Sequence, residues 1–179
     1  MFELGFSTLG CPSHEVGQVI ALARDNRFVG VELRFLRGEV DLPKLEELSP
    51  AGVRETRRRF EDAGVQVVCI ASGVRLNSPD PEERRWQLAS VRAHCEIAEA
   101  LGAPYLRVFG GPIPEYQDTE ATLDAIAAGL SRAAGETSAR GVTTLLETPD
   151  AFATSDRVLD LFVRGAGGAL GILWDTLHT

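Results

Sequence analysis

Cysteine is scarce in this sequence, and the three residues present, Cys11, Cys69 and Cys95, show no C-x-x-C spacing. An odd number without that spacing indicates neither a disulfide framework nor a thiolate zinc site, and reduced thiols fit a cytosolic protein. The sequence also lacks an apolar run near the roughly 20 residues of a membrane-spanning helix and the basic and apolar segments of a signal peptide. We therefore expect a cytoplasmic protein with no membrane partner.

Positive charge is also in short supply, because 18 Lys and Arg face 26 Asp and Glu, giving a formal net charge of -8. Such a chain repels polyanions, whereas nucleic-acid binders usually carry a basic face. We expect no nucleic-acid partner and a small polar ligand instead. One basic cluster, Arg54, Arg57, Arg58 and Arg59, is interpreted as a solvated helix face rather than a docking patch.

Six apolar runs alternate with helix-period segments along the 179 residues, at positions 4–7, 28–33, 65–71, 104–109, 142–147 and 170–174. The runs are nearly continuous in Val, Ile and Leu, which is typical of strands buried on both faces. Strands and helices in alternation predict parallel strands joined by right-handed crossovers, either in an open sheet or in a barrel.

Helix boundaries are marked by capping residues. Ser49 and Asp80 each precede a proline, a pattern that favours a helix start. Three glycines follow predicted last turns, where a left-handed conformation is wanted: Gly64, Gly102 and Gly141. The segment 118–140 is predicted to be a long helix with a buried stripe of apolar residues.

Two observations favour the barrel over the open sheet. No G-x-G-x-x-G or G-x-x-x-x-G-K-[ST] motif follows a strand, so the usual phosphate-binding turns are missing. Polar residues gather at the carboxyl ends of the strands, where a parallel barrel builds its active site; they are Ser7, Thr8, Glu32, Arg34, Ser72, Glu147 and Asp175. The sequence therefore predicts a (β/α)8 barrel fold.

The residues best placed for chemistry are Glu147 and Asp175, each at the end of an apolar run. Neighbouring strands lie about 4.8 Å apart, so two carboxylates at matching heights can share one divalent cation. The alternative is that each acid caps the helix or turn that follows. His178 lies three residues beyond Asp175, and a tight turn would return its imidazole toward the same pocket.

Five segments resemble the sugar phosphate isomerase/epimerase proteins of the xylose-isomerase-like TIM-barrel superfamily: residues 5–12 (GFSTLGCP), 30–34 (GVELR), 106–111 (LRVFGG), 146–149 (LETP) and 174–178 (WDTLH). The resemblance implies that Glu147 and Asp175 ligate one Mn, Mg, Co or Zn ion and that His178 contacts the substrate. It also implies that Glu147 is one of two acid/base residues that move a proton next to a ketose carbonyl.

The resemblance covers the whole sequence but about two-thirds of the family's usual length. We expect a single domain over residues 1–179 that lacks strands seven and eight, from which the family takes a His and a Glu ligand. With those groups missing, the chain as given should bind metal poorly and show little activity. Its open first and sixth strands should favour a homo-oligomer.

Other expectations remain open. Glu32 and Arg107 are predicted to pair in the barrel interior, because both belong to even-numbered strands, and to contact the substrate. His94 is predicted to lie at the surface. Competing functions are dehydration of a cyclic polyol ketone, an apurinic endonuclease-like nuclease, and a catalytically inactive binding module. The nuclease resemblance would require histidines at the ends of strands three and four, where the sequence reads ASG and FGG.

Overall fold

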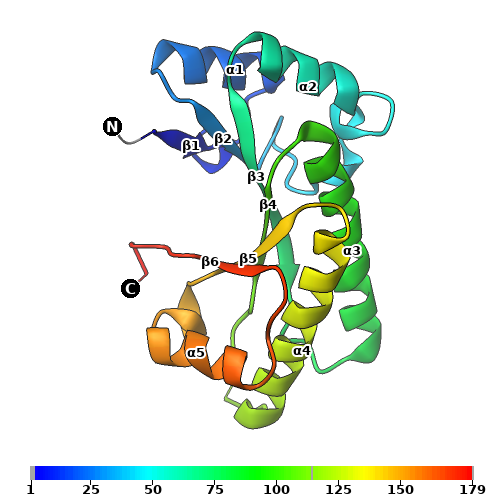
Figure 1. Ribbon diagram of the computed structural model, residues 1–179, viewed down its shortest axis with the longest axis vertical. Helices are drawn as coiled ribbons and strands as arrows, with labels where there is room; N and C mark the ends of the chain where they lie inside the picture. Colours follow the sequence, from blue (N-terminus) through cyan, green and yellow to red (C-terminus); the bar gives the residue numbers. More distant parts are fainter. Residues whose placement is uncertain (1–2, 114, 179) are drawn as a thin grey trace. The chain divides into compact units, whose positions relative to one another are not determined.

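The computed structural model describes residues 3–113 and 115–178, and strands alternate with helices throughout this part of the chain (Figure 1). The six strands form one sheet in the sequential order β1-β2-β3-β4-β5-β6. Their bounds are Gly5–Ser7, Gly30–Leu33, Gln66–Arg75, Tyr105–Phe109, Thr143–Glu147 and Leu170–Leu173. All six predicted strands are therefore present, and parallel strands in sequential order are those of a (β/α)8 barrel, of which the described residues contain six strands and five α-helices.

Five helices connect these strands: α1 Val16–Asp25, α2 Val53–Asp62, α3 Pro81–Leu101, α4 Thr119–Ser138 and α5 Ser155–Val163. Gly64, Gly102 and Gly141, which follow α2, α3 and α4, have φ of 68°, 74° and 72°, and this confirms the predicted left-handed conformation at the helix ends. Asp80 caps α3 by accepting a bond of 2.9 Å from the Glu82 amide. Ser49 also makes the predicted capping bond, because its hydroxyl accepts from the Gly52 amide three residues on; regular helix α2 begins at Val53, one turn later.

The chain divides into two compact units. The first consists of Met1–Ser72 with Ala93–Leu106, and the second of Gly73–Arg92 with Arg107–Thr179. In the first unit β1 and β2 are parallel, with Ser7 opposite Glu32. In the second, β5 and β6 are parallel, with Glu147 opposite Leu173.

Helix α4 covers one face of β5 in the second unit. Its predicted apolar stripe is fully buried and consists of Leu123, Ile126, Ala127, Leu130 and Ala134. The hydroxyls of Thr137 on α4 and Thr144 on β5 lie 2.8 Å apart, and both side chains are buried. Because side chains alternate along a strand, Thr144 and Leu146 face α4. Thr143, Leu145 and Glu147 consequently point to the opposite face of the sheet.

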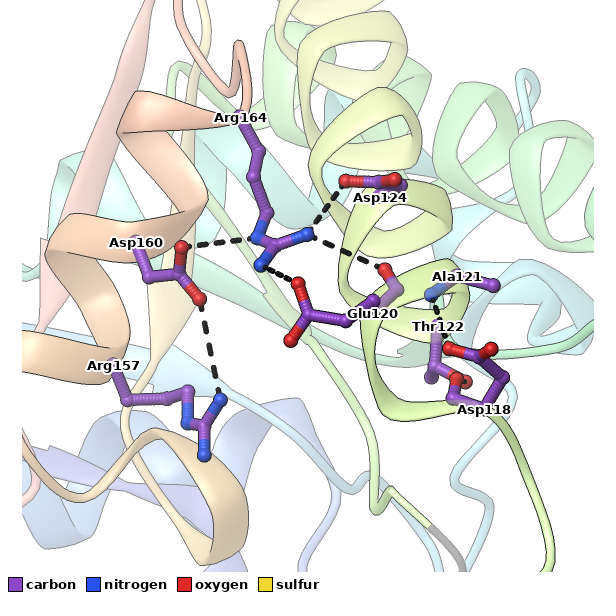
Figure 2. A network of polar contacts seen from close by, with 8 residues as sticks. All are labelled: Asp118, Glu120, Ala121, Thr122, Asp124, Arg157, Asp160 and Arg164. Carbon is purple, nitrogen blue, oxygen red and sulfur yellow. Dashed lines mark hydrogen bonds and ion pairs between the residues drawn. The ribbon is translucent and has the colours of Figure 1, made fainter.

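A single arginine ties α5 to α4 (Figure 2). Arg164, directly after α5, pairs with Asp160 at 3.0 Å, with Asp124 at 2.7 Å and with Glu120 at 2.5 Å. These carboxylates raise the pKa of Arg164, chiefly through the hydrogen bond to Glu120. The guanidinium therefore stays charged and holds the two helices together beside β5 and β6.

Other surface expectations divide. All four arginines of the basic cluster on α2 are exposed, as predicted. The prediction for His94 was wrong, because this residue is only 2% exposed. It lies on α3 in one stripe with the buried Val91, Cys95 and Ala98, at helical spacings of three and four. In the described part of the chain, no helix has the length and apolarity to cross a membrane.

Candidate active site on the second unit

The site is built around Glu147, which ends β5 on the face turned away from α4. Its carboxylate lies 2.9 Å from Nε of Arg107, and the two side chains are 17% and 5% exposed. Arg107 comes from β4, and its guanidinium also stacks 4.1 Å from the ring centroid of Phe109. A charge this buried would cost several kcal/mol if left unpaired. The ion pair therefore offsets part of the cost of burying these two charges.

Asp175 lies in the loop two residues beyond β6, which ends earlier than the predicted strand. Gly171 stands opposite Leu145, and Leu173 opposite Glu147. A Cβ added at Gly171 would come within 2.7 Å of the Leu145 side chain, so these residues share one face. Continuing the alternation places Asp175 on the face of Glu147, which agrees with the premise of the predicted two-carboxylate site. Whether the two share a cation stays a prediction.

The loop after β6 folds back on itself, so that His178 returns toward Asp175. The Asp175 amide donates to the Thr148 hydroxyl at 3.1 Å, and Asp175 Oδ1 accepts from the Leu177 amide at 2.8 Å. Nε2 of His178 then lies 3.6 Å from Asp175 Oδ2. This is the tight turn that the spacing predicted.

Glu32 occupies the end of β2 in the first unit. Its carboxylate accepts a hydrogen bond of 2.6 Å from the Ser7 hydroxyl, and the two residues stand opposite each other on β1 and β2. Arg107 belongs to the second unit, where Glu147 pairs with it. The Glu32–Arg107 pair and the contact of both residues with a substrate stay predictions, and the pairing of Arg107 with Glu147 was not foreseen.

The donor chemistry of the site fits a divalent cation in part. Two carboxylates supply the hard oxygen ligands that Mg and Mn prefer, and an imidazole also suits Zn or Co. Within residues 3–113 and 115–178, no three His, Cys, Asp or Glu side chains gather closely enough to hold a metal ion. Metal binding by Glu147 and Asp175 therefore stays a prediction.

Comparison with known proteins identifies the architecture. Residues 20–179 match the family model described as xylose isomerase-like TIM barrel. No curated protein matches the chain. Among solved structures, an IolI protein with a bound zinc atom has a TM-score of 0.83 at 15% identity, with 99% of this chain and 64% of that chain covered.

Two further solved structures are sugar epimerases. An L-ribulose 3-epimerase has a TM-score of 0.81 at 19% identity, with 99% of this chain and 62% of that chain covered. D-Psicose 3-epimerase with D-tagatose from Clostridium cellulolyticum H10 has a TM-score of 0.78 at 18% identity, with coverage of 99% and 64%. The chain thus spans less than two thirds of the length of these structures, and at such identities the likeness shows the fold.

Proposed function

Because the chain belongs to the xylose isomerase-like TIM-barrel family, we propose that it is part of a cytoplasmic, metal-dependent isomerase or epimerase for a small sugar or sugar derivative. The observation that carries the proposal is the placement of Glu147 and Asp175 at neighbouring strand ends on one face, with His178 turned back beside Asp175. Similar structures include two sugar epimerases, which supports the same class of substrate.

In this proposal Glu147 removes the proton from the carbon next to the substrate carbonyl. Arg107, whose Nε lies 2.9 Å from one carboxylate oxygen of Glu147, orients that carboxylate. A divalent cation held by Glu147 and Asp175 would polarise the carbonyl and hydroxyl oxygens. His178 would donate a hydrogen bond to a substrate oxygen, and its Nε2 lies 3.6 Å from Asp175 Oδ2, which supports a shared role for the two residues.

Nuclease activity is less well supported. Strand β4 leads into Gly110 and Gly111, and the predicted end of the third strand reads ASG at residues 71–73, so neither place holds the histidine that the nuclease resemblance requires. The net charge of -8 also opposes a nucleic-acid phosphate backbone. The sugar enzyme therefore explains the site better than the nuclease does.

The proposed metal site is tested by titrating the purified chain with Mn²⁺ and following water-proton relaxation. We expect weak binding, and Glu147→Gln and Asp175→Asn should each weaken it by about tenfold or more, since even outer-shell losses cost roughly 10- to 100-fold. Asp62→Asn removes an exposed carboxylate from α2 and serves as the matched control. Unchanged Mn²⁺ binding in both site variants would exclude this metal site.

Ketose epimerisation is then assayed for the chain as given and for a version extended by two further strand-helix units. We expect little activity from the former, because proton return on the opposite face of the substrate needs a second acid/base group. Full activity and tight Mn²⁺ binding in the shorter, monomeric form would show that its metal site and acid/base set are already complete.

A further inference from the structure

A second arginine, Arg75, lies at the carboxyl end of β3 and projects toward the face that carries Glu147. Its strand neighbours Val74 and Leu76 are buried. Leu76 faces α4, because a Cβ added at Gly129 would come within 3.2 Å of the Leu76 Cβ. Alternation along β3 then turns Arg75 to the other face of the sheet.

The ring of Phe109 confirms this orientation, because two guanidinium groups lie close to it. Arg107 lies 4.1 Å and Arg75 5.9 Å from the ring centroid. The guanidinium carbons are consequently within about 10 Å of each other, the largest separation that these two distances allow. Arg75 is thus held near the Arg107–Glu147 pair by a cation–π contact, a type worth about 0.5–1 kcal/mol at exposed sites.

The two arginines differ in how their charge is neutralised. Arg107 is buried and pairs with Glu147. Arg75 is exposed, and in the part of the chain that the structure describes no carboxylate pairs with it. Its hydrogen bond to Gln87 comes from the backbone amide, at 3.1 Å, and leaves the guanidinium donors unused. A chain with eight more acidic than basic residues therefore keeps one cation without an acidic partner beside its candidate site.

We propose that Arg75 binds an anionic group of the substrate, a phosphate ester or a carboxylate remote from the reacting carbonyl. This inference rests on the proposed function and names the substrate class of the same site. A planar guanidinium binds either oxyanion through two parallel hydrogen bonds. In the proposed function, Glu147 removes the proton and a cation polarises the carbonyl, so neither step needs Arg75. A free arginine on this face is therefore suited to recognition rather than to proton transfer.

The test compares three ketoses that differ at carbon six: D-fructose, D-fructose 6-phosphate and D-fructuronate, whose carbon six is a carboxylate. Binding to the full chain is measured by ligand-observed NMR with Mn²⁺ present and absent. We expect at least one anionic ketose to bind tenfold or more tightly than D-fructose. The preference between phosphate and carboxylate identifies the group that Arg75 takes.

Arg75→Met should remove this preference, and Arg75→Lys should keep part of it, because a lysine retains the charge without the bidentate geometry. Arg54→Met removes another exposed arginine, on α2, and should leave binding unchanged. Equal binding of all three ketoses would overturn the inference while leaving the proposed sugar enzyme intact. An anionic preference that survives Arg75→Met would also overturn it, and binding of no ketose at all would contradict both proposals.

Discussion

The buried hydroxyl pair between α4 and β5 permits a prediction whose sign can be worked out atom by atom. Thr137 and Thr144 are fully buried, and their hydroxyl oxygens lie 2.8 Å apart. Thr137 also donates to the Ala134 carbonyl at 3.3 Å. A hydroxyl has one proton, and if Thr137 donates it to Ala134, Thr144 is the donor in the pair; this is the direction that the variants test. Thr137 accepts from Thr144 and donates to its own helix.

Replacement of each threonine by the isosteric valine should therefore have unequal effects. Thr144→Val removes a donor, while the Thr137 proton keeps its bond to Ala134; the loss should be about 1 kcal/mol, the net worth of a typical hydrogen bond. Thr137→Val leaves the buried Thr144 hydroxyl without an acceptor, and an unsatisfied buried group costs about 1–3 kcal/mol. The double variant has no stranded group and should be less destabilised than Thr137→Val alone.

Urea unfolding followed by far-UV circular dichroism measures these differences as midpoint shifts at constant slope. Thr119→Val, at an exposed position on the same helix, is the control and should lie within about 0.5 kcal/mol of the parent chain. Additive losses in the double variant, or a larger loss for Thr144→Val than for Thr137→Val, would refute the assigned direction of the bond.

Two further predictions concern the packing of the second unit. Arg164→Met should lower the melting temperature at low salt, because it breaks the ion pairs that join the end of α5 to Asp124 and Glu120 on α4. The difference should shrink in about 1 M NaCl as the charges are screened. Arg157→Met, whose ion pair to Asp160 spans 4.0 Å, is the control, and a salt-independent loss equal to that of the control would contradict the role given to Arg164. Gly110→Ala should lower the free energy of unfolding measured in urea by roughly 1–3 kcal/mol, because its Cβ would clash with the buried Phe152 ring. Recovery of stability on adding Phe152→Leu would support that cause, and an unchanged stability of the Gly110→Ala single variant would exclude the clash.

The strand pattern could be predicted from the sequence because each short apolar run is bounded by turn residues and alternates with a helix-period segment. Each predicted run overlaps one of the six strands, and the predicted ends of β4 and β5 agree with the structure. Predicting the strand end also located Glu147, and alternation gave its face. These features depend on residues close together in the chain, which is why local pattern sufficed.

Features that depend on which distant groups meet could not be predicted in the same way. Pairing by alternate strands suggested Glu32 for Arg107, and that pair stays a prediction, whereas the Arg107–Glu147 pair on adjacent strands was not foreseen. The role of Arg75 was missed because an arginine at a strand end carries no signal until its neighbours are known. His94 was a different failure, since its spacing of three from Val91 and four from Ala98 already indicated the buried side of α3.

Strand β6 lies at an edge of the sheet in the described part of the chain and ends two residues before the candidate ligand Asp175. Ile172 and Trp174 are 38% and 67% exposed, and together with α5 they line a largely apolar groove of about 580 Å³. Beside it, the side chains of Asp175 and His178 are 27% and 48% exposed. Water at this edge leaves apolar surface hydrated and also screens the attraction between Asp175 and a cation, which grows as the local dielectric falls. Covering the edge would therefore stabilise the fold and tighten metal binding together, so the two properties should rise in parallel in any assembly that buries Trp174.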